Sequence, residues 1–492
     1  MEVAISVVTG ELVSRFISFL MNKYYSPLSD AQSEEKLVGR LQHLLMRVSI
    51  VIEEADARYI TNSGMLLQLK MLSEAMYKGY HVLDTLRYQT LQDSAGFDEV
   101  SINDSSSSSL YLAIPFKRSR TYSEKDDKAM RLESDGALES LEIVVANMAE
   151  FVVLLGGCER MSRRLYDVYL YTSNFMFGRH AEKQKLLSFL LEKNSPPGDH
   201  ALAVLPVIGG VGVGKKTLVA HVCGEERVRS RFSSILNLNG DNLLTILNHG
   251  RNMFGMMLVV IELTSDVGDD DWKKFHSFLI RISRGSKIII ISKLKRLARL
   301  GSVQPIFLSA LSYDELSYLF KTLAFGSVYP TEHPRLVQLA DEFAKELHNT
   351  HSSLLAANMF ADVLRRNLDV HFWRCILDKG LRHVRRNLSM YGAHPSTLIE
   401  QGHPVDITDF ASHPLTMTSY TASVSIKEES PSVTLGELLA DPSVIPKKDF
   451  ILISWESRIP PHKTFAHFVT SRADDTHQGR ALPGRKRRGV PI

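Results

Sequence analysis

Cysteine is scarce in this chain of 492 residues. The three that occur, Cys158, Cys223 and Cys375, are scattered without CxxC spacing, which excludes a disulfide framework or a cysteine zinc site and indicates a reducing compartment. No apolar run reaches the ~18 residues of a membrane-spanning helix, and the first residues lack the basic region and small-residue cleavage site of a signal peptide. We therefore predict a soluble, cytoplasmic protein, with the nucleus or a membrane surface as alternative locations.

An excess of charge is also lacking. The 58 Lys and Arg residues nearly balance the 55 Asp and Glu residues, for a net charge of +3, which argues against a specific nucleic-acid partner. The basic run Arg485–Arg488 is local, and it is either a solvated tail or a nuclear-import or anionic-surface patch. Hydrophobic residues make up 44% of the chain, enough for buried cores in about three domains.

Apolar residues recur at helical spacing through residues 1–160. The stripes lie in Val3–Tyr25, Leu37–Ala55, Leu66–Leu86 and Leu138–Val152, and a polar insertion with the serine run Ser105–Ser109 precedes the last of them. Four amphipathic helices predict a small α-helical bundle. Periodicity alone does not separate a structural bundle from one that self-associates or docks a partner.

Residues 161–325 alternate short apolar runs with helical stretches. This order is typical of an α/β fold with a parallel sheet buried under helices on both faces. The expected strands are Ala201–Ile208, Ser234–Leu238, Met257–Glu262, Lys287–Ser292 and Pro305–Leu308.

Helical periodicity then continues to residue 390. Ser312 and Glu315 form a capping-box sequence for one of these helices, and a helical subdomain is predicted over residues 326–390. Beyond it, prolines, histidines and serines interrupt the pattern, which predicts an irregular tail over residues 391–492 with an isolated strand such as Phe450–Trp455.

The clearest functional signal follows the first expected strand. Residues 201–218 read ALAVLPVIGGVGVGKKTL, an apolar run, then glycines, then lysines and a threonine at the start of a helix. Glycines let backbone N–H groups approach a polyphosphate, the helix presents the positive end of its dipole, and a lysine neutralises phosphate charge. The pattern predicts a P-loop, against the alternative of a glycine-rich turn that binds nothing.

Two registers fit the motif G-x-x-x-x-G-K-[ST]. In the preferred one Gly209, Gly214 and Lys215 fit, and Lys216 stands where a hydroxyl should ligate Mg²⁺. Thr217 then lies one position further along the helix, within reach of a phosphate. The other register uses Gly210, Lys216 and Thr217, but it places Lys215 in the tight turn, where a side chain is poorly tolerated.

Two later strands end in charged residues. Glu262 closes one strand and is the candidate metal-side carboxylate, while Leu263 after it cannot polarise water. Lys293 follows another strand, where it either senses a terminal phosphate or is solvated. Lys216 in place of the hydroxyl and Leu263 after Glu262 favour phosphate binding over catalysis.

In order, these segments resemble the NB-ARC domain of plant intracellular immune receptors, the nucleotide-binding leucine-rich-repeat class, in its coiled-coil subgroup. The resemblance covers about residues 1–390. MFGR at Met176–Arg179 resembles the motif that lies against the nucleotide in that family, and GGVGVGKKT at Gly209–Thr217 resembles GMGGVGKTT. LVVIEL at Leu258–Leu263 resembles LLVLDD, and GSKIIIISK at Gly285–Lys293 resembles GSRIIVTTR.

The resemblance also shows departures. In Ala75–Tyr88, which resembles the helix with the EDVID-type motif, Tyr80 and His81 replace the first two acids and Asp84 remains. SSLLA at Ser352–Ala356 approximates GLPLA, with Leu354 in the place of the proline. No Met-His-Asp tripeptide and no leucine-rich-repeat periodicity occur in the sequence, so we expect a degenerate member.

The resemblance implies an ADP- or ATP-binding signalling protein of plant innate immunity, with weak or absent hydrolysis and an uncertain Mg²⁺. Its expected partners are other immune receptors or signalling proteins, bound through the helical bundle. The alternative is a nucleotide-free adaptor acting on full-length receptors, and a working ATPase or kinase is the least favoured hypothesis. The expected ligand-binding residues, with Glu262 for the metal, are Gly178, Arg179, Gly209, Gly210, Val211, Gly212, Val213, Gly214, Lys215, Lys216, Thr217, Leu218 and Lys293.

Overall fold

The computed structural model divides the chain into two compact units. The first comprises residues 1–370 with 457–462, and the second comprises 371–456 with 463–492. The described residues are 30–95, 124–160, 177–192, 202–240, 255–282, 285–350, 354–411, 413–419, 431–446, 449–457 and 464–471.

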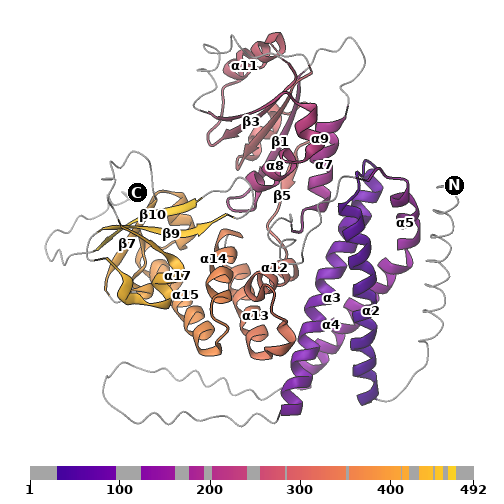
Figure 1. The fold of residues 1–492 in the computed structure, drawn as a ribbon, viewed down its shortest axis with the longest axis vertical. Helices are drawn as coiled ribbons and strands as arrows, with labels where there is room; N and C mark the ends of the chain where they lie inside the picture. The colour runs from indigo at the N-terminus through magenta and orange to yellow at the C-terminus, as the bar shows by residue number, and fades with distance from the viewer. Residues whose placement is uncertain are drawn as a thin grey trace, which may run out of the picture. The chain divides into compact units, whose positions relative to one another are not determined.

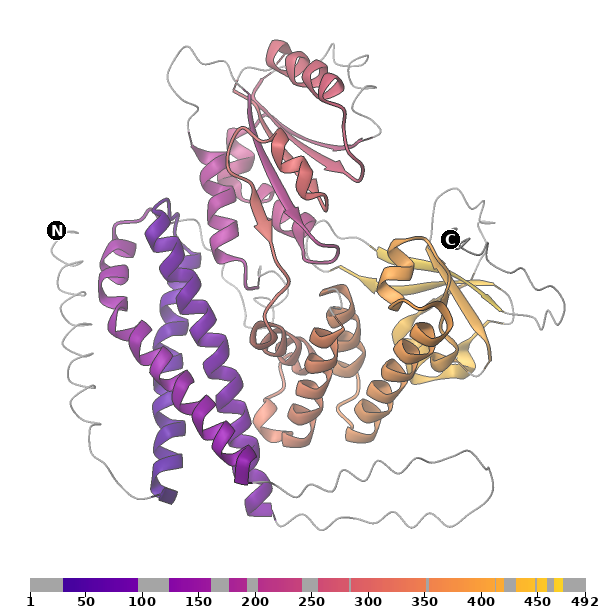
Figure 2. The ribbon, with the colours of Figure 1, turned by 180° about the vertical axis from the view of Figure 1, so that it is seen from behind.

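The first unit begins with a helical bundle. Its described helices are α2 (Asp30–Asp56), α3 (Ser63–Ala95), α4 (Glu124–Ala146) and α5 (Met148–Gly156), which lie side by side in Figures 1 and 2. The predicted stripes form one core, in which Leu41, Leu69 and Leu141 are fully buried. The fourth predicted helix is divided in two at Asn147, and the first, Val3–Tyr25, lies outside the described residues.

A five-stranded sheet follows, and every strand pairing in it is parallel. The strand order β2-β3-β4-β1-β5 puts β1 between β4 and β5. All five predicted strands are confirmed to within two residues at either end. They are β1 (Ala203–Gly209), β2 (Ser234–Asn239), β3 (Met257–Leu263), β4 (Lys287–Ser292) and β5 (Ile306–Leu308).

Helices cover both faces of this sheet. Alternate residues of a strand point to opposite faces, and the cores divide accordingly: Val207 and Ile289 face α7, α8 and α9, whereas Ile208 and Ile290 face α11 and η3 (Figure 1). The covering elements are α7 (His180–Leu191), α8 (Lys215–Cys223), α9 (Glu226–Arg231), α11 (Asp269–Ile282) and η3 (Lys295–Leu300). Burial on both faces explains why these strands are apolar at nearly every position.

The remainder of the first unit is helical, as predicted. It comprises α12 (Tyr313–Phe325), η4 (Pro330–Glu332), α13 (Pro334–Asn349) and α14 (Leu354–Arg365). The Ser312 side chain accepts from the backbone N–H of Glu315, and the Glu315 carboxylate accepts from that of Ser312, so the predicted capping box is present.

The prediction of an irregular tail beyond residue 391 is wrong. The second unit contains another five-stranded sheet, with the order β6-β7-β10-β9-β8 and only the β8–β9 pair parallel (Figure 2). The predicted strand Phe450–Trp455 is confirmed as β9. The elements are α15 (Val370–Tyr391), α16 (Pro395–Glu400), β6 (Val405–Asp406), η5 (Thr408–Phe410), β7 (Leu415–Ser419), β8 (Ser432–Thr434), α17 (Leu435–Ala440), η6 (Pro442–Val444), β9 (Phe450–Glu456) and β10 (Thr464–Ser471).

The tail pattern was misleading for a physical reason. β6 has two residues and β8 has three, too few for alternation to be recognised. β10 pairs with both β7 and β9, and β7 is more than forty residues away in the sequence, so local periodicity does not reveal the partner.

Among the described helices of the whole chain, none is long and apolar enough to cross a membrane.

Candidate phosphate-binding site

The parallel registers bring three predicted site segments to one edge of the first sheet. Ile208, just before the glycine loop, pairs with Ser292, just before Lys293. Leu263 pairs with Ser292 on the other side of β4. Because these strands run in the same direction, the glycine loop, Glu262 and Lys293 all lie at their carboxyl ends, where ligands bind in open α/β sheets.

The glycine loop requires glycine at three positions. Gly212 has φ +70° and Gly214 has φ +91°, a left-handed conformation that costs a residue with a Cβ atom. At Gly209 a Cβ atom would come within 2.6 Å of the Leu308 carbonyl oxygen of β5. Gly214, directly before helix α8, is the left-handed residue. The preferred register requires a glycine at this position, whereas the other register would place Lys215 in the turn.

Helix α8 begins at Lys215, directly after the loop. The Lys215 ammonium donates to the Gly210 carbonyl oxygen at 2.5 Å, so this side chain turns back across the loop. The backbone N–H of Leu218 donates to the Gly214 carbonyl oxygen at 2.9 Å, and the Leu218 side chain is fully buried. Thr217 is half-buried, and Val211 is exposed.

Lys216 points toward the end of β3. Its ammonium lies 2.5 Å from Oε1 of Glu262, and the two side chains are 41% and 32% exposed. A divalent metal here would need an oxygen from the residue at position 216 and a free carboxylate. The chain supplies an ammonium instead, and that ammonium engages the carboxylate, so these residues do not fit Mg²⁺.

Arg179 ties the segment before α7 to the loop. Its guanidinium is 5% exposed and donates to the carbonyl oxygens of Ser309 at 2.5 Å and Val213 at 3.4 Å. Burial lowers the pKa of Arg179, and the Glu182 and Glu315 carboxylates oppose that shift. Gly178 has φ +66°, so the preceding turn also depends on glycine.

The start of α14 closes the other side of the loop. The backbone N–H of Leu354 donates to the Gly212 carbonyl oxygen at 3.2 Å. Leu354 stands at the position that matched the family's proline, and the structure brings this position to the glycine loop. Ser352 and Ser353 lie outside the described residues.

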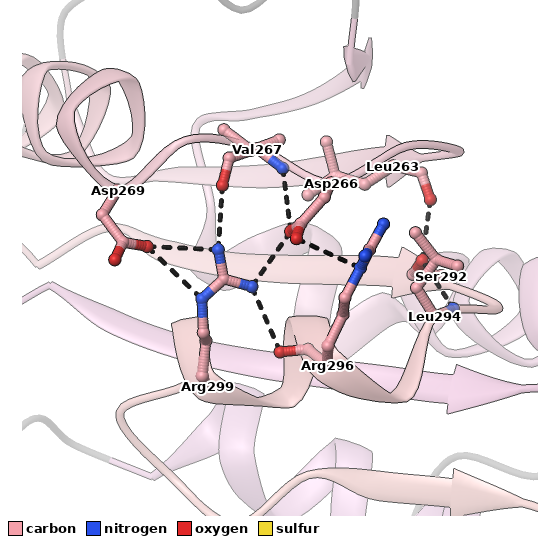
Figure 3. Close-up of polar contacts among 8 residues, drawn as sticks. All are labelled: Leu263, Asp266, Val267, Asp269, Ser292, Leu294, Arg296 and Arg299. Atoms are coloured by element: carbon pink, nitrogen blue, oxygen red, sulfur yellow. Dashed lines mark hydrogen bonds and ion pairs between the residues drawn. The ribbon is translucent and has the colours of Figure 1, made fainter.

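The loop after β3 is held by an ion-pair cluster, which sequence reasoning missed (Figure 3). The Arg299 guanidinium contacts Asp266 at 3.0 Å and Asp269 at 3.1 Å, and Arg296 contacts Asp266 at 3.1 Å. The hydrogen bond from Arg299 lowers the pKa of Asp266. Two basic residues in η3 and the acidic residues after β3 were the available signal, but only the parallel register shows that they meet.

Leu263 is 2% exposed and packs in the core between the sheet and α11. Its carbonyl oxygen accepts a hydrogen bond from the Ser292 hydroxyl at 2.7 Å (Figure 3). The second acid of the related motif is thus replaced by a core residue.

Lys293 is exposed at the same edge. Within the parts of the chain that the structure describes, no group of three or more His, Cys, Asp or Glu side chains could hold a metal ion.

The arrangement therefore combines a glycine loop, the N-terminus of α8 and two ammonium groups at the edge of a parallel sheet. Backbone N–H groups and the helix dipole favour an anion. Lysine side chains add point charges that suit phosphate oxygens.

Comparison of the sequence with curated proteins finds plant disease resistance proteins. The chain is 22% identical over 399 residues to putative disease resistance RPP13-like protein 1 of Arabidopsis thaliana, which covers 74% of this chain and 36% of that protein. It is 26% identical over 376 residues to putative disease resistance protein RGA4 of Solanum bulbocastanum, covering 70% of this chain and 35% of the relative. The chain thus spans about a third of the length of these relatives.

No family model matches the chain. Among solved structures, C. elegans PCH-2 matches with a TM-score of 0.27 and 12% identity over 42% of this chain and 69% of that one. Domain III of the Thermotoga maritima replication initiation protein DnaA matches with a TM-score of 0.23 and 13% identity, over 47% of this chain and 93% of that one. These scores are too low to support an argument, and the fold rests on the sheet described above.

The curated relatives and the motifs point to the same family. The relatives align with about 70% of the chain, and the predicted segments meet at one edge of one sheet. The resemblance predicted from the motifs is confirmed: the chain is a relative of the plant disease resistance proteins.

Proposed function

We propose that the chain is an ADP- or ATP-binding signalling protein of plant innate immunity, with weak or absent hydrolysis. The observation that carries the proposal is the glycine loop between β1 and α8, in which Gly212 and Gly214 adopt left-handed conformations and the Lys215 ammonium lies over Gly210. This arrangement suits the phosphates of a nucleotide. The disease resistance relatives supply the biological setting.

In this proposal the backbone of Gly209–Gly214 surrounds the phosphates, and Lys215 neutralises them. Thr217 assists from the next position of α8, and Lys293 approaches from the end of β4. Arg179 and Leu354 hold the loop from either side through its carbonyl groups. The proposal retains residues 1–160 and 161–325 as separate parts, but it ends the following helical part near residue 370, because α15 belongs to the second unit.

Weak hydrolysis follows from two side chains. Phosphoryl transfer to water needs a bound metal and a group that orients the water. Lys216 replaces the metal hydroxyl, and the buried Leu263 replaces the second acid. A working ATPase or kinase is therefore disfavoured, and binding itself would act as the signal.

The second candidate is a nucleotide-free adaptor that acts on full-length immune receptors through the helical bundle. Exposed apolar side chains in the bundle favour it: Met46 is 54% exposed and Ile50, one turn later on α2, is 58% exposed. Such a surface suits another protein or a second copy of the chain. An exposed apolar surface on the bundle is compatible with nucleotide binding. A measurement of bound nucleotide therefore distinguishes the nucleotide-binding protein from the nucleotide-free adaptor.

The test is to purify the full chain natively, denature it, and quantify the released nucleotide against protein. Near-stoichiometric ADP or ATP is expected, because a P-loop that retains its glycines and Lys215 holds phosphate. Lys215→Ala should lower nucleotide occupancy and affinity by about tenfold or more. Lys274→Ala on α11, which removes a 68% exposed lysine, is the matched control and should change neither.

A protein that releases no nucleotide and takes up none of the added ADP or ATP would contradict the proposal. The adaptor function would then be favoured. Equal affinities of the wild type and Lys215→Ala would instead remove Lys215 from the site.

A further inference from the structure

The Lys216–Glu262 pair occupies the position of a metal site. Lys216 is the second residue of α8, and Glu262 is the next-to-last residue of β3. In a P-loop protein these two positions provide the hydroxyl and the carboxylate side of a magnesium shell. Here they are joined directly at 2.5 Å.

The chemistry of this pair opposes a divalent ion. Mg²⁺ requires oxygen ligands at near-octahedral positions. A lysine ammonium has three N–H donors and no acceptor, and it repels a second cation placed within a few ångströms. The hydroxyl ligand expected at position 216 is therefore missing, and the carboxylate of Glu262 is already neutralised by Lys216.

The same chemistry suits a phosphate. Because the ammonium carries three donors and Glu262 takes one of them, two donors remain for phosphate oxygens. Lys216 is 41% exposed, so solvent and a ligand can reach it. Lys215 and Lys216 together bring two positive charges to the loop, against the one negative charge of Glu262.

We propose that Lys216 acts as a built-in cation in place of Mg²⁺, so that the site binds its nucleotide free of metal. This inference rests on the nucleotide site proposed above. Glu262 is then a positioning residue that aims the ammonium of Lys216 at the phosphates. It is not a metal ligand.

The inference predicts an inverted response to magnesium. Mg²⁺ binds ADP in solution and so removes the metal-free form that the site accepts. ADP affinity, measured by isothermal titration calorimetry on the full chain at constant ionic strength, should be higher in EDTA than in excess Mg²⁺. An equal affinity in the two buffers, or a loss of affinity on chelation, would overturn the inference.

Lys216→Thr is the decisive variant, because it restores a hydroxyl and releases Glu262. In this variant added Mg²⁺ should raise ADP affinity by about tenfold. With Mn²⁺ and ADP, electron paramagnetic resonance should show protein-bound Mn²⁺ for Lys216→Thr and none for the wild type. Lys274→Thr is the matched control and should respond to magnesium as the wild type does.

Glu262→Gln provides a second variant in case Lys216→Thr does not fold. If Glu262 only positions Lys216, the variant should keep the wild-type response to magnesium, with an ADP affinity changed by less than about tenfold. If Glu262 binds a metal, any enhancement by Mg²⁺ present in the wild type should vanish in the variant, and the inference is refuted. ADP that binds in neither buffer would refute the nucleotide site itself, whereas ADP that binds only with Mg²⁺ would refute the built-in cation alone.

Discussion

The Lys321 ammonium lies 2.5 Å from the Asp84 carboxylate and joins α12 to α3 of the bundle. Asp84 is the acid that remains from the EDVID-type motif, so the departures at Tyr80 and His81 have not removed an intramolecular charge contact. Aromatic rings surround the pair: Tyr318 of α12 packs against the Tyr80 ring at 5.0 Å. This buried lysine and the aromatic cluster are among the contacts that join the bundle to the rest of the first unit.

Asp84→Asn should weaken this attachment. Lys321 is 8% exposed and Asp84 is 31% exposed, so the variant leaves a mostly buried ammonium without its counter-charge. We expect a loss of about 1–3 kcal/mol in the free energy of unfolding and faster hydrogen exchange in α3 and α12. Glu74→Gln, which breaks the exposed Lys70–Glu74 pair, should cost about 0.5 kcal/mol or less. Equal effects of the two variants would show that the Asp84 contact is not formed in solution.

Gly209→Ala tests the geometry of the glycine loop. The added Cβ atom would meet the Leu308 carbonyl oxygen at 2.6 Å, which forces β5 or the loop to shift and should cost about 1–3 kcal/mol of stability. At Gly210 the nearest atom would be 3.7 Å away, so Gly210→Ala should change stability by about 0.5 kcal/mol or less. Urea denaturation of the two variants measures the difference. A neutral Gly209→Ala would mean that the end of β1 is not packed against β5.

Sequence reasoning was most successful where a local pattern has one physical cause. The strand Lys287–Ser292 was predicted with both ends correct, because a strand buried on both faces is apolar throughout. The capping box of Ser312 and Glu315 was predicted because both partners lie within one turn of the chain. Each of these features depends on neighbours in the sequence.

The features that were missed depend on partners far apart in the chain. The sequence showed Lys216 as a departure from the P-loop motif and Glu262 as a candidate metal ligand. It did not show their ion pair, because that pair depends on where α8 lies against the end of β3. The contact of Arg299 with Asp266 depends likewise on the register of β3 and β4. The second sheet was missed because its strands are short and pair across long intervals. Periodicity contains no information on such pairings.

Arg299→Lys should loosen the loop that follows β3. The guanidinium contacts Asp266, Asp269 and the Val267 carbonyl at once (Figure 3), and a lysine cannot reproduce this fork. Because the side chains are exposed, global stability should change little. Hydrogen exchange in residues 264–269 should nevertheless become faster. Lys295→Arg, in an exposed neighbour of the same segment, is the control and should leave that exchange unchanged.

The second unit should lose stability in acid because of His383. Its ring packs against Phe410 at 4.7 Å, and burial lowers its pKa to about 4, an effect that outweighs the nearby Asp406 and Asp409 carboxylates. The unfolded state therefore takes up a proton more readily than the folded state, so stability is complete above pH 6.5 and falls as the pH drops toward 4.

Hydrogen exchange of α15 in the full chain, corrected for the intrinsic effect of pH, measures this loss. His383→Gln should flatten the dependence between pH 6.5 and 4, whereas His371→Gln, at the exposed start of α15, should not. A wild-type profile that is flat over this range would show that the pKa of His383 is not lowered in the folded unit.

Restoring hydrolysis should require both missing groups. Lys216→Thr alone supplies the metal hydroxyl, but Leu263 still offers no acid to orient water, so phosphate release from ATP should stay near the wild-type rate. Adding Leu263→Asp should raise the rate if only these two groups are absent. Leu263 is 2% exposed in an apolar core, so the added carboxylate should also cost about 2–4 kcal/mol of stability.

This cost requires its own control. Leu263→Asn introduces a polar side chain of similar size without a carboxylate, so it should destabilise the chain to a comparable extent and leave turnover low. A double variant with Asp that stays folded, binds ATP with Mg²⁺ and still releases no phosphate would locate the defect elsewhere. The start of α14 would then be the next region to change, since Leu354 replaces the related proline beside Gly212.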